Sequence, residues 1–362
     1  MEAKQPPNRH AGRFTISIVL ATLAVTTMMV ALRTETCAQT GSTSVGLVSN
    51  RPVVDDQGFV WMSHQGLLRA ETELGVNGTL YTSTNSAQYQ PNLQQCSDDG
   101  NDLCISVGFE MADATLSAAQ ANTNTHFAIV DFSWDSYPDN LRGIVFAADE
   151  AGYLAGTLAG LMTDSDLIGV IGGAPIPRVD QFVAGYRNGA QCLSPSVTVL
   201  VNYAYDFESP ALGAELAQDM IGQGADVIFA PAGPTGAGAV LTATQSGVWG
   251  IGVDSDFYVT VFESGTVNGS EKLLTSAMKR ADNVVFDTIE DVVSDTFTPG
   301  TALYDLEADG VGLAPFHDAD PYVSQSVRDT LQDVEQGIID GTIDVQHPCR
   351  SFVYLPLTIR NY

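Results

Sequence analysis

Short apolar runs alternate with helix-period segments along most of the chain, and this alternation constrains the fold more than any other feature. Strands that alternate with helices of about ten residues form βαβ units, whose strands lie parallel in one sheet. The first unit is a strand at 45–48, a turn-rich segment at 49–58, and a helix that ends near Gly75. A second series of such units begins at about residue 144. The pattern therefore predicts an α/β protein built on parallel sheets.

Length and composition indicate two domains. A chain of 362 residues, of which 44 % are hydrophobic, is too long for one ordinary core and has enough apolar side chains for two. No low-complexity linker separates the halves, so we expect several short crossovers to join them. Near the end, the pattern predicts a helix over 272–293, a strand pair within 302–314 with a hairpin turn at Asp309-Gly310, and a helix over 321–340.

The N-terminal segment has the features of an export signal. Residues 1–13 are polar and basic, and residues 14–32 form an uninterrupted apolar or hydroxylated run, followed by a polar stretch. Because the run is long enough to span a bilayer, residues 1–43 are either a cleaved signal with a short linker or a retained anchor. Cys37 leaves lipidation as a third alternative. All three place the remaining chain outside the cytoplasm.

The charge of the chain limits its partners. The formal net charge is −28. Nucleic acids and anionic membrane surfaces are repelled by such a body, so neither is an expected partner. An acidic surface of this kind is typical of solubility in a salty or acidic exterior.

Five cysteines are compatible with disulfides in an exported protein. Cys96 and Cys104 flank an Asp- and Gly-rich turn, and we expect a local disulfide between them. Cys192 and Cys349 could then pair, with Cys37 free or removed with the signal. The sequence alone leaves this connectivity open.

Patterns for catalysis and metal binding are absent from the sequence. The histidines have no metal-ligand spacing, and neither a CxxC motif nor a GxSxG nucleophile elbow occurs. The adjacent Asp55 and Asp56 fit capping of the following helix better than paired acid–base chemistry. Ligands of open α/β sheets gather at loops that leave the carboxyl ends of strands, so segment 49–58 is the expected binding loop. We expect no enzymatic activity, no cofactor and no metal.

Six blocks of sequence carry a resemblance that covers about residues 44–344. They are GLVSNRPVVDDQGF, ADEAGYLAGTLAGLM, GGAPIPRVDQFVAGYRNGA, QGADVIFAPAGPTGAG, GIGVDSD and LLTSAMKRAD. In this order they are similar to the basic membrane protein family, the purine-nucleoside-binding lipoproteins that serve as solute receptors of ABC importers. Six collinear blocks are far more specific than any single motif.

The resemblance implies the type I periplasmic-binding-protein fold, in which two doubly wound parallel-sheet lobes, joined by crossover segments, close on a ligand. Lobe 1 would comprise residues 44–143 and about 257–303, lobe 2 residues 144–256 and about 304–345, and the tail residues 346–362. The implied protein is a monomer that binds a nucleoside and presents it to an ABC permease. The alternatives are a sensor that signals to a membrane partner and, from another class, a nucleoside-processing enzyme.

The resemblance also implies which residues contact the base. Phe59 and Phe207 correspond to aromatic residues that stack on its two faces, because flat heterocycles and aromatic rings bury π surface against each other. Asp131 corresponds to a position near the edge of the base, where a carboxylate accepts hydrogen bonds from ring N–H groups.

Other positions correspond to contacts with the sugar. Asp254 matches the acid that binds the two ribose hydroxyls, and Lys279 matches a lysine that donates to the sugar region. Gly233 and Gly236 would let the backbone approach the sugar.

The first loop, which also supplies Asp56 as an expected contact, departs from the family pattern. Asn50 stands where the family has an aspartate, and Val60 stands where it has an asparagine after the stacking phenylalanine. Asn50 can still donate and accept hydrogen bonds, whereas Val60 can do neither. We therefore keep Asn50 as a ligand contact, with the preferred base open.

Overall fold

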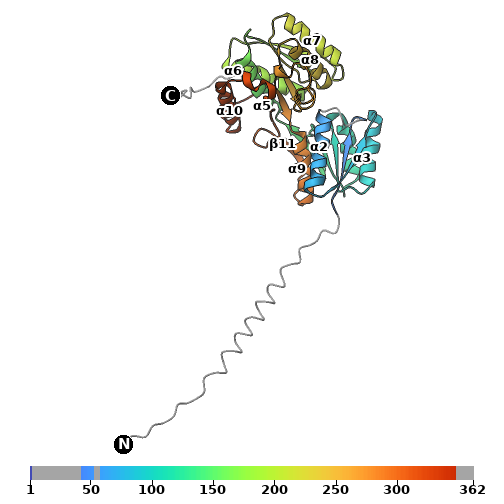
Figure 1. Ribbon diagram of the computed structural model, residues 1–362. Helices are drawn as coiled ribbons and strands as arrows, with labels where there is room; N and C mark the ends of the chain where they lie inside the picture. Colours follow the sequence, from blue (N-terminus) through green and yellow to red (C-terminus); the bar gives the residue numbers. More distant parts are fainter. Residues whose placement is uncertain (2–41, 53–57, 348–362) are drawn as a thin grey trace. The chain divides into compact units, whose positions relative to one another are not determined.

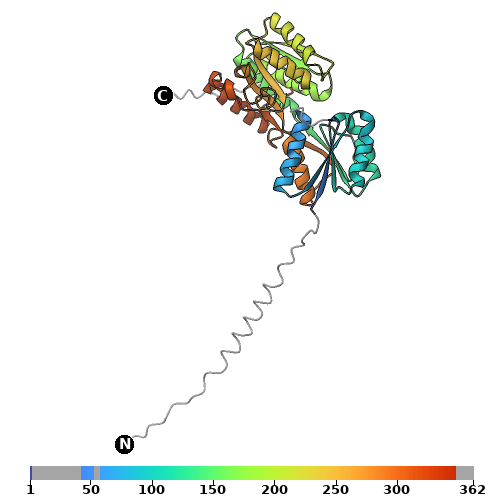
Figure 2. The same ribbon diagram turned by 45° about the vertical axis from the view of Figure 1, so that its right-hand side comes forward.

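The computed structural model describes Met1, residues 42–52 and residues 58–347. Its first sheet has six parallel strands in the order β11-β5-β4-β3-β1-β2. Helices cover both faces, α2 and α9 on one and α3 and α4 on the other (Figures 1 and 2). We call this sheet with its helices the first lobe. Its elements are β1 (Ser44–Ser49), α2 (Phe59–Glu73), β2 (Asn77–Thr82), α3 (Tyr89–Asp98), β3 (Leu103–Val107), α4 (Ala112–Ala121), β4 (His126–Val130), β5 (Leu141–Phe146), α9 (Ala281–Val293) and β11 (Gly300–Tyr304).

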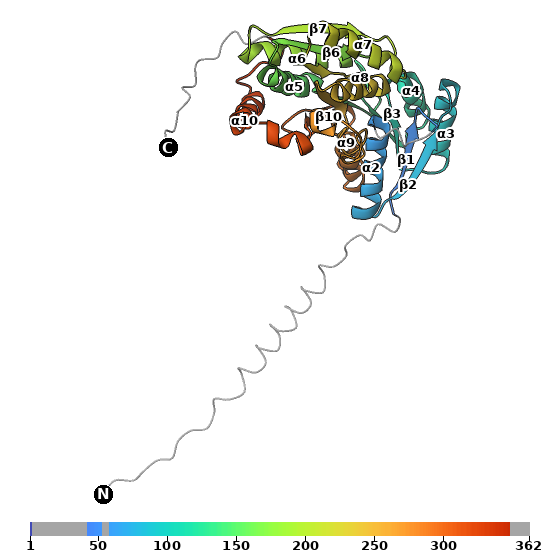
Figure 3. The same cartoon turned by 45° about the horizontal axis from the view of Figure 1, so that its top comes forward.

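A second sheet repeats this plan in the order β12-β10-β9-β8-β6-β7, with β12 antiparallel to β10 and the other pairs parallel. Helix α5 packs on α6, and α7 packs on α8 (Figure 3). We call this sheet with its helices the second lobe. Its elements are α5 (Ala148–Met162), β6 (Leu167–Gly172), α6 (Pro177–Leu193), β7 (Thr198–Tyr203), α7 (Pro210–Gly222), β8 (Val227–Phe229), α8 (Gly233–Gln245), β9 (Trp249–Asp254), β10 (Leu273–Lys279), β12 (Val311–Leu313) and α10 (Gln325–Ile339).

The predicted α/β class with two parallel sheets is confirmed. The central strands β1, β3 and β4 are buried along nearly their whole length, because helices cover both faces of the sheet. Gly75 has the left-handed φ of 69° expected just after the end of α2. Four short 3₁₀ helices complete the described secondary structure, at Ser86–Gln88, Phe109–Met111, Ser270–Lys272 and His317–Tyr322.

The chain passes between the two lobes at Ala147, at Arg280 and at residues 305–310, within the range that the structure describes. These crossovers are hydrogen-bonded to each other or to neighbouring strand ends. Ala147 N donates to Tyr304 O at 2.9 Å, and Arg280 N donates to Gly310 O at 2.8 Å. The lobes are therefore joined by several short, mutually connected segments, as the sequence predicts.

Two predictions for residues 272–314 are wrong. Leu273–Lys279 is a buried strand, β10, and the helix begins only at Ala281. Asp309-Gly310 does not close a hairpin, because β11 pairs with β5 in the first sheet and β12 pairs with β10 in the second. As a consequence, β10 belongs to the second lobe although it falls within the 257–303 range that was expected in lobe 1.

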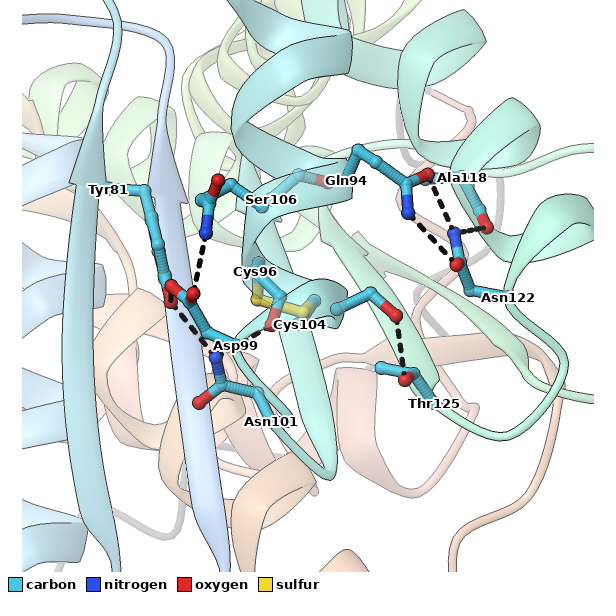
Figure 4. Close-up of a disulfide and its surroundings, with 12 residues drawn as sticks. Tyr81, Gln94, Cys96, Asp99, Asn101, Cys104, Ser106, Ala118, Asn122 and Thr125 are labelled. Atoms are coloured by element: carbon cyan, nitrogen blue, oxygen red, sulfur yellow. Dashed lines mark hydrogen bonds between the residues drawn. A yellow bond between two sulfur atoms is a disulfide. The ribbon is translucent and has the colours of Figure 1, made fainter.

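The predicted disulfide between Cys96 and Cys104 is confirmed, and it ties α3 to β3 (Figure 4). Asn101 holds the turn between them, because its Nδ2 donates to Cys96 O at 2.8 Å and to the Tyr81 hydroxyl at 3.0 Å. Cys192 is also disulfide-bonded.

Several predictions concern residues outside the described ranges. They are the signal or anchor in 1–43, with Cys37, and the tail with Cys349. Among the described residues, no helix is both long enough and apolar enough to cross a membrane.

The contact between α7 and α8 has no space for a side chain at Gly213. A Cβ there would overlap the carbonyl oxygen of Thr235, whereas a Cβ on Gly222 of the same helix would meet no atom within 4 Å. We expect Gly213→Ala to lower the free energy of unfolding by about 1–3 kcal/mol, because overpacking displaces the backbone. Gly222→Ala is the matched control and should be neutral or stabilising, by up to about 1 kcal/mol. Urea unfolding measures both, and equal effects would contradict this packing.

Candidate functional site

A cavity of about 370 Å³ is lined by residues from both lobes. The lining residues come from loops and helix starts at the carboxyl ends of the parallel strands, which is where open α/β sheets bind ligands. The volume is within the range of small-molecule sites, about 300–1,000 Å³. This cavity is therefore the candidate ligand site.

Seven of the nine predicted site residues line the cavity, namely Asn50, Phe59, Asp131, Phe207, Gly233, Asp254 and Lys279. Gly236 is not among the described lining residues. A Cβ at this position would overlap the carbonyl oxygen of Ala230, so this glycine allows the start of α8 to pack closely on the preceding loop. Asp56 lies outside the described residues.

Phenylalanine rings from both lobes line the cavity, and the two predicted rings, Phe59 and Phe207, are among them. Phe59 is the first residue of α2 and packs edge-on against Phe146, with ring centroids 6.1 Å apart. Phe207 follows β7, and its ring covers Gly173 so closely that any side chain at position 173 would overlap it. Both phenylalanines are only partly buried, so each has ring surface left for a ligand.

A buried ion cluster connects the two lobes at the cavity. Lys279 Nζ, at the end of β10, lies 3.0 and 3.1 Å from the two carboxylate oxygens of Asp131, which follows β4. Arg178 Nε, in the first turn of α6, lies 3.6 Å from the same carboxylate. Burial lowers the pKa of Arg178, and the negative charges of Asp131 and Glu110 oppose that shift. The sequence predicted separate ligand contacts for Asp131 and Lys279, whereas here they bind each other.

Lys279 is surrounded by aromatic rings as well as by the carboxylate. Its side chain is 6 % exposed, and Nζ lies 5.4 to 5.7 Å from the ring centroids of Phe59, Phe146 and Phe182. Cations are attracted to the faces of such rings at this distance. The lysine therefore contributes a fixed positive charge to the cavity wall next to Phe59.

The two cavity aspartates share an unusual backbone conformation. Asp131 has φ 73° and Asp254 has φ 63°, in the left-handed region that few residues other than glycine adopt. Asp131 follows β4 and Asp254 ends β9, and these strands occupy the same place in the two strand orders. Strained residues of this kind concentrate at functional sites. The two lobes thus present a carboxylate to the cavity from equivalent positions.

Sequence reasoning missed several cavity residues that connect the lobes. Arg51 Nη2 lies 2.7 Å from Glu208 Oε1, and the Arg178 guanidinium stacks over the Phe109 ring at 4.0 Å. Glu110 lines the cavity next to Phe109. Their position in the segments that connect strands to the next helices was the available signal, but only the folded chain shows which of them meet across the lobes. Within the described residues, no group of His, Cys, Asp and Glu could hold a metal ion.

The chain is similar in sequence to a known protein family and to several known proteins. A family model described as ABC transporter substrate-binding protein PnrA-like matches residues 44–347. A CD4+ T-cell-stimulating antigen of Listeria monocytogenes is 32 % identical over 320 residues, covering 83 % of this chain and 87 % of that protein. The ABC transporter nucleoside-binding protein BmpA of Lactococcus lactis is 31 % identical over 313 residues, covering 83 % and 88 %.

A solved structure shows the same fold. The solute-binding protein of an ABC transporter system from Aeropyrum pernix is similar with a TM-score of 0.71 and 23 % identity, over 83 % of this chain and 92 % of that one. The predicted type I periplasmic-binding-protein fold is confirmed.

The ion cluster predicts an order of mutational effects. Asp131→Ala leaves two cations, Lys279 and Arg178, without their shared carboxylate, and should cost about 3–5 kcal/mol of unfolding free energy. Lys279→Met should cost less, because Asp131 keeps Arg178 as a partner. Urea unfolding of the ligand-free variants measures the order. A larger loss for Lys279→Met would show that the carboxylate does not hold the cluster together.

Proposed function

The chain belongs to the PnrA-like family of ABC transporter substrate-binding proteins, and we propose that it binds a nucleoside, preferably a purine nucleoside, in the cavity between its lobes. The single observation that carries this proposal is the pair of rings, Phe59 and Phe207, that line one cavity from separate lobes. Stacking of a base on aromatic side chains contributes about 1–3 kcal/mol per base.

The polar groups of the cavity suit the rest of a nucleoside. Asp254, from the second lobe, offers a carboxylate that accepts hydrogen bonds from vicinal ribose hydroxyls. Gly233, with φ 57° at the start of α8, brings backbone close to the same cavity. Lys279, anchored by Asp131, supplies a fixed cation. A small neutral ligand rich in hydroxyls meets these groups without needing a counter-charge of its own.

Ligand binding and signalling to the transporter follow from the two-lobed plan. A ligand that touches both lobes stabilises the closed arrangement by its preference for that state. A membrane permease is the partner of an ABC transporter substrate-binding protein, and we propose that it recognises the closed form. We also propose that the protein acts outside the cytoplasm as a monomer and returns its ligand chemically unchanged. Recovery of intact nucleoside after prolonged incubation tests the last point against the nucleoside-processing alternative.

The first measurement is native mass spectrometry of the chain from Ser44 to Tyr362, followed by titration of inosine, guanosine, adenosine and cytidine. We expect one nucleoside per chain. If no nucleoside is bound or retained, the proposal fails and the search moves to ring compounds without ribose.

Removal of either ring should weaken binding. We expect Phe59→Ala and Phe207→Ala each to raise the nucleoside Kd at least about tenfold, as loss of stacking on one face of the base requires. Tyr205→Ala is the matched control, since Tyr205 is near Phe207 in sequence, is 76 % exposed and does not line the cavity. Calorimetric titration measures all three. Unchanged affinity in either phenylalanine variant would remove that ring from the site.

Asp254 separates sugar recognition from base recognition. Asp254→Ala should weaken ribosides by a larger factor than the corresponding free bases, because only ribosides carry the hydroxyls that donate to the carboxylate. Titration of guanosine against guanine measures this difference. Equal losses for both would contradict the sugar role.

A further inference from the structure

The carboxylate of Glu110 stands in the cavity wall with an unused acceptor. Glu110 belongs to the 3₁₀ turn Phe109–Met111 that follows β3, and its side chain is exposed to the cavity. Its Oε2 accepts one hydrogen bond, from Asn50 Nδ2 at 3.3 Å. Within the described residues, its other oxygen has no hydrogen-bond or ion-pair partner. A carboxylate in this state can accept further hydrogen bonds but can donate none.

Asn50 holds this carboxylate in place from the neighbouring strand. Asn50 follows β1, which pairs with β3 in the first sheet, so the two side chains meet at adjacent strand ends. The amide orientation is defined, because the reverse orientation would place the Asn50 oxygen against the Glu110 oxygen. Asn50 Oδ1 itself is shielded from solvent and has no hydrogen-bond partner. Asn50 is therefore a positioning residue for Glu110.

The backbone at Gly108 allows this pair to form. A Cβ on Gly108 would lie 2.7 Å from Asn50 Nδ2 and 2.8 Å from Glu110 Oε2, so any side chain there would displace these two groups from their present positions. Gly108 also has φ 104°, a conformation that side-chain-bearing residues rarely adopt. Glycine at this position therefore leaves the space that the pair occupies.

Arg178, a cation that lines the same cavity, has other partners. The Arg178 guanidinium lies over the Phe109 ring at 4.0 Å and its Nε is 3.6 Å from Asp131. Among the described residues, no ion pair within 4.0 Å joins Arg178 to Glu110, although the negative charge of Glu110 acts to raise the pKa of Arg178. A ligand that enters the cavity therefore meets Glu110 as an available acceptor.

We propose that Glu110 is a specificity-determining residue that accepts a hydrogen bond from an exocyclic amino group of the base. This proposal rests on the proposed nucleoside function and narrows it to amino-bearing bases, such as those of adenosine, guanosine and cytidine. If the base carried a carbonyl oxygen in place of the amino group, that oxygen would face a carboxylate oxygen. Both atoms are acceptors, so no hydrogen bond could form between them. Once a bound ligand has displaced water from this carboxylate, an analogue without the donor leaves it unpaired and is discriminated against.

The test compares nucleosides with and without an exocyclic amino group. Calorimetric titration of the chain from Ser44 to Tyr362 measures the Kd of each nucleoside. The values are compared for adenosine and inosine, for guanosine and inosine, and for cytidine and uridine. Guanosine and inosine differ in that group alone, whereas the members of the other two pairs also differ in a hydrogen on the adjacent ring nitrogen. We expect the amino-bearing member of at least one pair to bind at least tenfold more tightly. That ratio corresponds to about 1.4 kcal/mol.

Glu110→Gln is the decisive variant, because glutamine keeps the size of the side chain and removes the carboxylate. The preference should fall below threefold. The matched control is Glu208→Gln, which removes the same charge from the opposite lobe of the same cavity. This variant breaks the ion pair with Arg51. It should weaken the binding of both compared nucleosides by the same factor, so that the ratio of their Kd values is unchanged.

The role of Asn50 is tested by a double-mutant cycle. Asn50→Leu removes the donor that holds Glu110 and should reduce the preference several-fold. In the Glu110→Gln variant, the further change Asn50→Leu should not alter the ratio of the Kd values of the two nucleosides, since the two residues act through one contact. Additive effects on the ratio would overturn the positioning role.

The outcomes separate this proposal from the function on which it rests. If the native protein binds no nucleoside, the proposed function fails. If it binds nucleosides without an amino preference, or keeps the preference in Glu110→Gln, the function stands and the role of Glu110 is overturned. A preference that disappears only in the Glu110 and Asn50 variants supports the proposal.

Discussion

The contact of Asp131 with Lys279 and Arg178 is the interaction on which the site depends. The carboxylate belongs to the first sheet, and both cations belong to the second lobe. A lysine side chain that is only 6 % exposed requires an anion beside it, because an unpaired buried charge is costly. The pair therefore joins the ends of β4 and β10, and it places the Lys279 charge beside Phe59. A ligand has to fit around this cluster, in which one carboxylate faces two cations.

The repeated plan of the two lobes explains why the site lies where it does. Each sheet places its third strand, β4 or β9, so that a left-handed aspartate follows or ends it. Each lobe also supplies phenylalanines, Phe59 among them in the first and Phe207 in the second, and glycine-containing turns. The cavity residues around these shared positions differ between the lobes. They include Asn50 and Glu110 in the first lobe and Gly233 in the second. Recognition can therefore differ between relatives by changes in loops, while the sheets stay the same.

The sequence alone predicted those elements that are specified by a short, continuous stretch of residues. Apolar runs bounded by Gly and Asp identified most of the strands, and the Cys96–Cys104 spacing identified a disulfide. The strand β10 was missed because it is buried on both faces and leads directly into an amphipathic helix, so its period was read as helical. Seven of the nine site residues predicted from the sequence line the cavity. The resemblance could not locate Arg178 or Glu110, because their importance comes from Asp131 and Asn50, which are distant in sequence and adjacent only in the folded chain.

The pairing of β11 with β5 has a consequence for how the chain acquires its structure. Gly300 aligns with Arg142, 158 positions earlier, so the first sheet is completed only after nearly all of the second lobe has been synthesised. Until then β5 is an edge strand with unpaired backbone groups, which promotes association with other chains. Contacts so far apart in sequence also make folding slow. Neither lobe is a continuous piece of chain, and we therefore infer that they reach the native state together, as one cooperative unit.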